Sequence, residues 1–413
     1  MITNFYNSKY IFSLLVYTVL TRNLNSLAVS YAHKNGRSIH SATITKQGCS
    51  SLKRMSMLTY KADKCEFIRL HPSWVTGFSD AESCFNIAVF KSSSNKTGWG
   101  VKPTFRIDLH KKDAGLLKMI KTYFESVSAN GDTFNKTSGS IGMLTLNRLL
   151  GCNIGNLSVP GSAEKASYVV SSLEELKFII AHFDDYPLLT EKRESYRIWR
   201  EIVLMIERKE HLTIEGLKKI VKLKATLNWG LSEALITAFQ INTLEDKVTS
   251  KEAVVKEDLK EAVSLGHIVA SSHTEKVSFH PQWLGGFVSG DGSFMIQIEK
   301  KDGKYFPRLI FQLTQHSCDT ELMVNLTSYL GCGGVSKNSE STSAVKLRVT
   351  KFSDICTKII PLFQGNLILG VKSKDFADWC IAADIIKNKG HLTQAGLDKI
   401  QELKANMNKE RDY

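Results

Sequence analysis

The chain has 413 residues, 43% of them apolar and 23% charged, which is the composition of an ordinary soluble protein with room for two or three domains. Its net charge of +13 includes eight Lys or Arg and no acidic residue in the first 62 positions, so the remainder carries only +5 (13 − 8) and charge alone does not argue for a nucleic-acid partner. The eight cysteines show no C-x-x-C pair and no framework spacing, which excludes a zinc site of that type and a disulfide scaffold, so we expect reduced thiols.

Residues 1–68 are predicted to be a leader that is poorly ordered or removed. Its apolar stretch at 11–20 is about ten residues long, too short to span a bilayer. The leader is rich in Ser, Asn and basic residues, which is typical of an organelle transit peptide.

One stretch then occurs twice, 209 residues apart: HPSWVTGFSDAESCF at 71–85 and HPQWLGGFVSGDGSF at 280–294. Each copy predicts a short helix that begins at Pro72 or Pro281, because proline fits the first helical turn. Gly77 and Gly286 occupy equivalent places, and glycine inside a helix costs about 1 kcal/mol against alanine. We therefore expect the two helices to pack closely against each other.

Glu82 and Asp291 stand at the C-terminal ends of these helices, where the helix dipole disfavours an anion by roughly 0.3–1 kcal/mol. If the helices pack side by side, the two like charges also repel each other. A divalent cation would remove both penalties, and Mg²⁺ held together with phosphate suits a site with few protein ligands. A single copy would be explained as well by a buried helix with a solvated acid, but two copies in register favour the shared site.

An alternating pattern follows each copy and predicts a β-hairpin with one apolar and one polar face. In the first copy Phe85, Ile87 and Val89 alternate with polar or small residues, a turn cluster occupies 91–98, and a return strand runs to His110. The second copy repeats the pattern over 294–299 and 311–316. The alternative is an ordinary amphipathic sheet whose polar face only meets water.

A further repeat has a different displacement. Residues 183–192 with Trp199 match 363–372 with Trp379, and 209–216 match 389–396, each 180 positions apart. The first half must therefore hold extra residues, chiefly within about 128–165, where Gly, Asn and Ser predict a loop. The runs 217–227 and 397–407 predict Thr-capped helices, and we expect His211 and His391 to be structural. The charged segment 241–278 is predicted to link the halves, with a solvated helix within 250–263.

The motifs VTGFSDAES at 75–83 and LGGFVSGDG at 284–292 resemble the two signatures of LAGLIDADG homing endonucleases, most closely the single-chain subgroup of fungal mitochondrial introns. The resemblance implies an α+β fold with two pseudo-symmetric αββαββα halves, at 69–240 and 279–413. Their antiparallel sheets would form a DNA-binding saddle, with the motif helices packed at the central interface. It also implies a monomer in the mitochondrion without a membrane partner. For the leader it adds a second interpretation, translated exon or intron sequence.

The resemblance further implies a site-specific endonuclease that makes double-strand breaks with 3′ overhangs, using Mg²⁺ or another divalent metal, and so promotes intron mobility. Glu82 and Asp291 would bind the metal with the carbonyls of Ala81 and Gly290. Lys192 and Lys372 would lie near the scissile phosphates. Gln315 would position water.

The side chains that the resemblance assigns to DNA are Asn86, Phe90, Ser92, Ser94, Lys102, Thr104, Arg106, Asp108, Gln297, Glu299, Lys301, Arg308, Gln312 and Thr314. Three positions depart from the family pattern: Ser83 replaces the usual glycine, Ser289 replaces the usual first acid, and Leu109 stands opposite Gln315 in the repeat. We therefore expect two inequivalent active sites. Two alternatives remain, an RNA maturase that assists splicing of the intron and an inactive DNA-binding protein. Retention of both acids and both lysines favours the nuclease over the inactive binder.

Overall fold

The computed structural model describes residues 69–130, 153–159, 161, 164–227, 230–240, 279–338 and 341–407. All of them belong to one compact unit, which begins at Ile68. The predictions for the leader, for the linker at 241–278 and for a helix within 250–263 lie outside the described residues.

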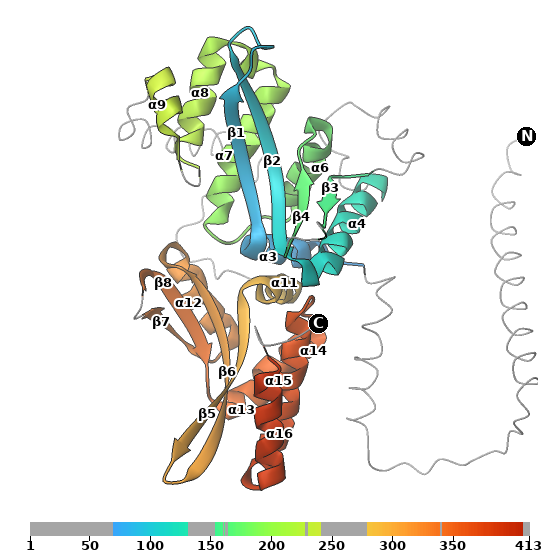
Figure 1. Ribbon diagram of the computed structural model, residues 1–413, viewed down its shortest axis with the longest axis vertical. Coiled ribbons are helices and arrows are strands. Elements are labelled where there is room, and N and C mark those ends of the chain that lie inside the picture. The colour runs from blue at the N-terminus through green and yellow to red at the C-terminus, as the bar shows by residue number, and fades with distance from the viewer. Residues whose placement is uncertain are drawn as a thin grey trace, which may run out of the picture. The chain divides into compact units, whose positions relative to one another are not determined.

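The described residues form two similar halves, which Figure 1 shows on either side of the helices α3 and α11. The first half runs through α3 (Pro72–Glu82), β1 (Ser83–Lys91), β2 (Trp99–His110), η1 (Lys111–Asp113), α4 (Ala114–Asn130), β3 (Asn156–Ser158), β4 (Lys165–Val170), α6 (Leu173–Asp185), α7 (Lys192–Glu207), η2 (Glu210–Leu212), α8 (Ile214–Lys224) and α9 (Glu233–Phe239). The second half runs through α11 (Pro281–Asp291), β5 (Gly292–Lys301), β6 (Lys304–His316), η3 (Ser317–Asp319), α12 (Thr320–Leu330), β7 (Gly334–Asn338), β8 (Ser341–Val349), α13 (Phe352–Asp354), η4 (Ile355–Ile359), α14 (Ile360–Gly365), α15 (Lys372–Lys387), η5 (Gly390–Leu392) and α16 (Gln394–Ala405).

Each half contains a four-stranded antiparallel sheet, in the order β1-β2-β4-β3 and β5-β6-β8-β7. The predicted α+β class is therefore confirmed. The loop prediction for 128–165 is wrong at three places. The helix α4 continues to Asn130, Lys165 begins β4, and Asn156–Ser158 forms the edge strand β3. Leu157 of this strand lies opposite the buried Tyr168 and packs on the core, a contact that the Gly- and Asn-rich composition concealed.

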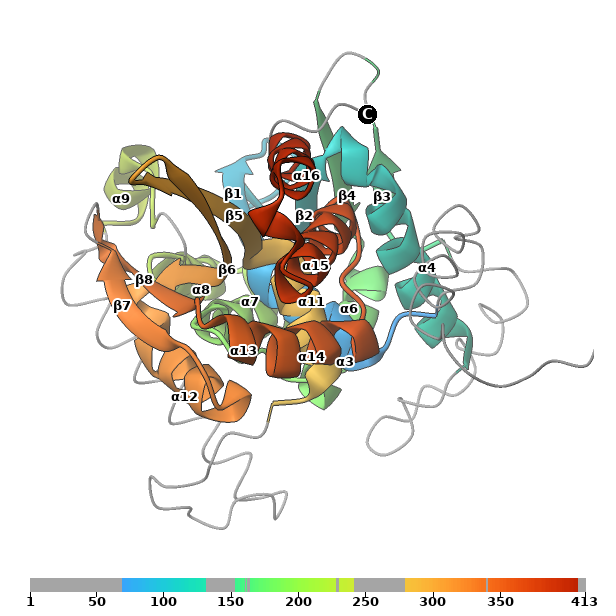
Figure 2. The same ribbon diagram turned by 90° about the horizontal axis from the view of Figure 1, so that it is seen from below.

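The motif helices touch through their backbones, as the glycines predicted. A Cβ on Gly77 would lie 1.9 Å from the carbonyl oxygen of Trp283, and one on Gly286 would lie 2.0 Å from that of Trp74. Figures 1 and 2 both show α3 and α11 side by side at the centre. This direct contact fixes the relative position of the two helix ends.

The other ends of these helices are capped by histidines. His71 Nδ1 accepts from Ser73 N at 3.1 Å, and His280 Nδ1 accepts from Gln282 N at 3.2 Å. The two imidazole rings stack with their centroids 4.5 Å apart. The seam between the halves is thus closed at the helix N-termini by one aromatic pair.

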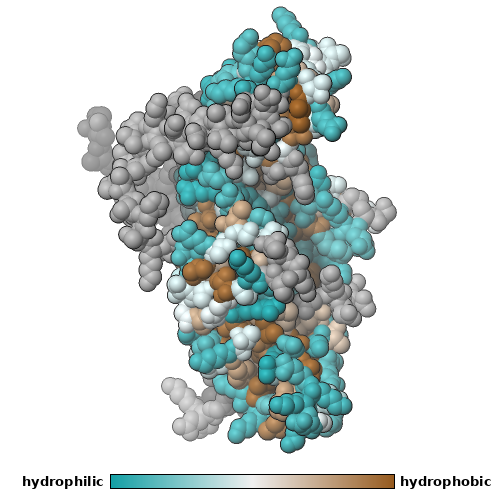
Figure 3. Space-filling view, turned by 90° about the vertical axis from the view of Figure 1, so that its left-hand side faces the viewer, coloured by the Kyte–Doolittle hydropathy of each residue, from teal (hydrophilic) through white to brown (hydrophobic). Residues whose placement is uncertain are grey.

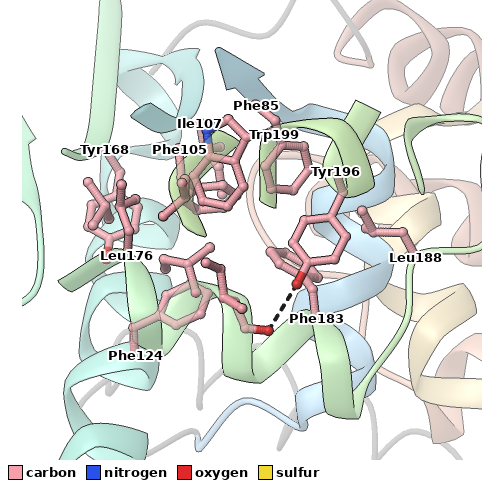
Figure 4. Packing of buried hydrophobic residues seen from close by; sticks show 14 of the residues in the cluster. Phe85, Phe105, Ile107, Phe124, Tyr168, Leu176, Phe183, Leu188, Tyr196 and Trp199 are labelled. Atoms are coloured by element: carbon pink, nitrogen blue, oxygen red, sulfur yellow. Dashed lines mark hydrogen bonds between the residues drawn. The ribbon is translucent and has the colours of Figure 1, made fainter. Parts of the chain in front are cut away.

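Each half has its own aromatic core beneath its sheet. In the first half the ring of Phe85 lies 5.2–5.5 Å from those of Phe105, Phe183, Tyr196 and Trp199 (Figure 4). In the second half the equivalent ring contacts are those of Phe294 with Phe311, Phe363, Phe376 and Trp379. The helices α7 and α15 supply the tryptophans, so the apolar face of each sheet is covered and its opposite face is left polar.

The predicted Thr-capped helices are present as α8 and α16, with Thr213 and Thr393 each accepting from a backbone N–H at 3.1 Å. None of the helices among the described residues has the length and apolarity that crossing a membrane requires. On the side of the molecule shown in Figure 3, apolar residues are interspersed among hydrophilic ones over the described elements.

Candidate active site

Glu82 and Asp291 are the last residues of α3 and α11, and the contact between these helices brings them to one place. A Cβ on Gly290 would lie 3.4 Å from Glu82 Oε1, so the Glu82 side chain lies against the residue that precedes Asp291. Burial raises the pKa of Glu82, and the Asp291 carboxylate raises it further. Burial likewise raises the pKa of Asp291. The two acids therefore share a partly dehydrated site.

Lys192 and Lys372 begin α7 and α15, and both ammonium groups reach the ends of the motif helices. Lys192 Nζ donates to the carbonyl oxygens of Ser79 and Ala81, each at 3.1 Å. Lys372 Nζ donates to the carbonyl oxygen of Gly290. Burial lowers the pKa of both lysines, while the neighbouring carboxylates oppose that shift. The structure thus brings both lysines to both acids.

Gln315 distinguishes the two sides of the site. It lies on β6, and its Nε2 donates to Asp291 Oδ2. Leu109 occupies the equivalent register on β2, because Phe105 pairs with Val170 as Phe311 pairs with Val349. Leucine has no hydrogen-bonding group, so Glu82 has no counterpart of this contact from β2.

A pocket of about 780 Å³ opens on the Leu109 side. It combines Glu82, Leu109 and His110 of the first half with Gly290 and Lys372 of the second. An acid from one motif and a lysine from the other half therefore line the same space. The chemistry available there includes cation binding, proton transfer and stabilisation of negative charge.

The site fits a hard divalent cation that takes few protein ligands. Two half-buried carboxylates that repel each other gain from a bound cation, and water and phosphate oxygens would complete its coordination. Within the described ranges, no three His, Cys, Asp or Glu side chains are grouped so as to hold a metal ion. The carbonyls of Ala81 and Gly290, predicted as further ligands, accept hydrogen bonds from the lysines in this structure.

The side chains predicted to contact DNA lie along the polar faces of the two hairpins or in the β1–β2 turn. On the first sheet Asn86 pairs with Thr104 across the strands, and Arg106 contacts Asp108 at 2.7 Å. Phe90 is 47% exposed and its ring covers Gly100. Ser92 and Ser94 hydrogen-bond to each other in the turn at 2.9 Å. Lys102 is exposed on β2, where it pairs with Ala88.

The polar face of the second sheet carries the corresponding side chains that were predicted to contact DNA. Gln297 lies opposite Arg308, and Arg308 approaches Glu299 at 3.3 Å. Gln312 donates to Thr314 at 3.1 Å, and Lys301 lies at the exposed end of β5. Both hairpins therefore present mixed donors and acceptors on one face.

The resemblance implied a second pair of strands in each half, but no residue of these strands was among those predicted to contact DNA. Lys165 and Ser167 of β4 contact Asp108 at 3.0 and 2.5 Å, and Arg348 of β8 donates to Gln312 at 2.6 Å. These residues extend the polar face of each sheet beyond the hairpin. The alternation Lys346, Leu347, Arg348, Val349 was the available signal, since its apolar members are the buried ones.

Comparison with known proteins decides the family. A family model described as LAGLIDADG endonuclease matches residues 75–141, 133–203 and 284–383. The chain belongs to this family. Two relatives from Neurospora crassa, a probable intron-encoded endonuclease 2 and a probable intron-encoded endonuclease 3, are 32% and 30% identical over 82% and 81% of the chain. The chain spans 66% and 54% of the length of these two relatives.

Among solved structures, the LAGLIDADG homing endonuclease I-SmaMI bound to cleaved DNA is 37% identical, with a TM-score of 0.66 over 83% of this chain and 98% of that one. The same LAGLIDADG enzyme has also been crystallised with an uncleaved DNA target and calcium ions. The resemblance read from the two motifs is thereby confirmed, as are the two-half architecture and its two antiparallel sheets.

Proposed function

We propose that this chain is a site-specific DNA endonuclease that binds double-stranded DNA as a monomer and cuts both strands. The observation that carries the proposal is the convergence of Glu82, Asp291, Lys192 and Lys372 at the ends of two touching helices. A protein that only binds DNA gains nothing from two half-buried carboxylates, which repel phosphate. The names of the relatives and the DNA-bound structure of I-SmaMI support the same activity.

We propose Glu82 and Asp291 as the ligands of a divalent cation, with Mg²⁺ as the expected ion. When bound, the cation supplies positive charge that stabilises the charge developing on phosphate during hydrolysis. The carbonyls of Ala81 and Gly290 are available as further ligands once the lysines release them. Gln315 holds the Asp291 carboxylate by its amide, so it fixes one ligand and not the other.

We propose that Lys192 and Lys372 act at the scissile phosphates, either by accepting a proton from water or by stabilising negative charge. Burial lowers the pKa of each, which favours a neutral amine that can accept a proton from water. A lysine that stays charged would instead stabilise the leaving oxygen. Either role requires that the lysine Nζ lie beside the Glu82 and Asp291 carboxylates. Its hydrogen bonds to the motif carbonyls keep it there.

The polar sheet faces are the proposed DNA-binding surface, with one half-site on each sheet. Arg106, Lys102 and Asn86 on the first sheet, and Arg308, Gln312 and Gln297 on the second, are donors that match base edges in the major groove. The predicted 3′ overhangs, the role in intron mobility and the mitochondrial location belong to the same proposal. They are supported by the intron-encoded relatives and by the first 62 residues, which are basic and contain no acid.

The test is cleavage of a supercoiled plasmid that carries the host gene's joined exons across the intron insertion point. Purified full-length protein with Mg²⁺ is expected to linearise this plasmid and to leave the intron-containing gene intact. Glu82→Gln and Asp291→Asn should still bind the site in a gel-shift assay but should not produce linear DNA. Linear product from the double variant would refute the assignment of the acids.

A further inference from the structure

Two aspartates outside the motifs reach across the interface between the halves. Asp113, in η1 of the first half, accepts at Oδ1 from the backbone N–H of Val371 at 2.7 Å. Asp319, in η3 of the second half, accepts at Oδ1 from the backbone N–H of Glu191, also at 2.7 Å. Val371 and Glu191 are the residues that immediately precede Lys372 and Lys192. Each half therefore holds the start of the helix that carries the other half's lysine.

The aspartates occupy the same local structure. Each follows a histidine that ends β2 or β6 and caps a short 3-10 turn. His110 Nδ1 accepts from Lys112 N at 3.2 Å, and His316 Nδ1 accepts from Cys318 N at 3.3 Å. The sequence pattern is His-x-x-Asp in both halves, at 110–113 and 316–319. Both carboxyls are drawn into the interface, and Asp319 is only 8% exposed.

The loops that meet these aspartates differ, although the contact is the same. Gly370 has φ +73°, and a Cβ there would lie 2.5 Å from Asp113 Oδ1, so the close approach requires glycine. In the first half Thr190 takes that place and donates to Asp80 by its N and Oγ1 at 3.1 and 2.7 Å. Two differently built loops thus preserve one hydrogen bond, from the residue before the lysine to an aspartate of the opposite half.

We propose that Asp113 and Asp319 are positioning residues, each of which fixes the first turn of the opposite half's lysine-bearing helix and so holds Lys372 or Lys192 against the motif backbone. The contacts of each lysine Nζ with the motif carbonyls depend on the position of the first turn of α15 or α7. The hydrogen bond to the aspartate fixes the position of that turn. Because the contacts cross the interface, each half is needed to complete the lysine site of the other. The proposal rests on the proposed nuclease function only for its effect on cleavage.

Lysine acetylation tests the positioning without DNA. The full chain is treated briefly with an acetylating reagent, and modification of Lys372 and Lys192 is quantified by peptide mass spectrometry. Asp113→Ala should raise acetylation of Lys372 several-fold and leave Lys192 unchanged, whereas Asp319→Ala should do the reverse. Asp113→Asn and Asp319→Asn keep an acceptor oxygen and should resemble the wild type. In each comparison the other lysine of the same molecule is the control.

Gly370→Ala breaks the same contact from the loop side and should also expose Lys372 selectively, which covers the case in which Asp113→Ala does not fold. Thermal melting identifies the folded variants. Acetylation of both lysines to the same extent, or of neither, in a folded variant that lacks the aspartate contact would overturn the proposal.

Cleavage adds a second measurement. On the joined-exon plasmid, Asp113→Ala should slow the same strand as Lys372→Met, by up to about 10²-fold if the lysine moves by an ångström. Asp319→Ala should slow the strand that Lys192→Met slows. In the Lys372→Met background, Asp113→Ala should have no further effect on strand cleavage, and an additive loss would count against the proposal. If the wild-type protein does not cut, the proposed function fails while acetylation still decides the positioning role.

Discussion

Trp283 of α11 donates a hydrogen bond from its indole Nε1 to Asp80 of α3 at 2.8 Å, across the interface between the halves. Asp80 also accepts from the backbone N–H groups of Leu189 and Thr190 and from the Thr190 hydroxyl. Burial nevertheless raises the pKa of Asp80. The second motif has Ser289 in the equivalent position, and its hydroxyl accepts from Leu369 N at 3.0 Å and donates to the carbonyl oxygen of Gly285 at 2.7 Å. The first acid of the motif therefore has a structural role, in one half alone.

Replacement of Asp80 should be strongly destabilising. Asp80→Ala leaves three buried donors and one partly buried donor without their acceptor, at about 1–3 kcal/mol for each buried one, so we expect a loss of more than about 3 kcal/mol in the free energy of unfolding. Ser289→Ala removes the acceptor of one donor and should cost about 1–3 kcal/mol. Urea denaturation of the two variants measures the difference. Equal losses would contradict the one-sided role of Asp80.

The glycines of the helix seam give a second stability prediction. Gly77→Ala and Gly286→Ala each place a methyl about 2 Å from a backbone carbonyl oxygen of the facing helix, so the helices must separate. We expect losses of at least about 3 kcal/mol, or failure to fold. Gly115→Ala is the matched control, because it lies in α4 with nothing within 4 Å of the added Cβ and should stabilise by about 0.5–1 kcal/mol. Chemical denaturation separates the two outcomes.

Much of the architecture could be predicted from local sequence. The motif helices, their contact at Gly77 and Gly286, and the hairpin strands follow from proline, glycine and alternation, which are local signals. The position of the edge strand β3 could not be predicted from the local sequence, because Asn156–Ser158 becomes a strand only by pairing with β4, about ten residues further along the chain.

The site was predicted in part. The repeat and the family resemblance pointed to Glu82, Asp291 and the lysines, and the structure brings them together. The contacts of Asp80, Asp113 and Asp319 join residues 109 to 258 positions apart in the chain. Helix and strand periodicity in the sequence cannot predict contacts between residues so far apart. The repeated His-x-x-Asp pattern at 110–113 and 316–319 did indicate that the two halves carry equivalent aspartates.

Stability should depend on pH through Glu82 and Asp291. Because burial raises the folded-state pKa of both above their unfolded values, ionisation destabilises the fold. Stability without metal should therefore fall as pH rises from the unfolded pKa through the folded one, by about 1.4 kcal/mol for each unit of the difference. Glu82→Gln and Asp291→Asn should raise the melting temperature at pH 7 and lose this advantage below about pH 4.

Calorimetry in a chelating buffer over pH 3.5–8 measures how stability depends on pH. Glu321→Gln is the control, because Glu321 is an exposed carboxylate on the first turn of α12. Added Mg²⁺ should raise the melting temperature of the wild type and have little effect on the double variant. Variants that are less stable than the wild type at pH 7 would contradict the raised pKa values.

The two active sites should differ because Gln315 holds Asp291 and Leu109 cannot hold Glu82. Gln315→Leu removes the contact with Asp291 Oδ2 and should slow cleavage of one strand, by roughly 10-fold for a lost hydrogen bond of about 1.4 kcal/mol. Leu109→Gln is the reciprocal variant and should change cleavage of the other strand. End-labelled duplexes report each strand separately, and nicked plasmid should accumulate with Gln315→Leu. Equal slowing of both strands would mean that Gln315 acts on the whole site.

Arg348 tests whether the proposed DNA surface extends beyond the β5–β6 hairpin to β8. It lies on β8, and its Nε donates to Gln312 Oε1 at 2.6 Å on the polar face of the second sheet. Arg348→Ala should weaken binding of the joined-exon duplex, and a phosphate contact would lower the salt-dependence slope by about 1. Lys399→Ala is the control, because Lys399 is paired with Glu402 on α16, which packs against the opposite face. Fluorescence anisotropy at several salt concentrations measures both, and equal effects of the two variants would confine the DNA surface to the hairpins.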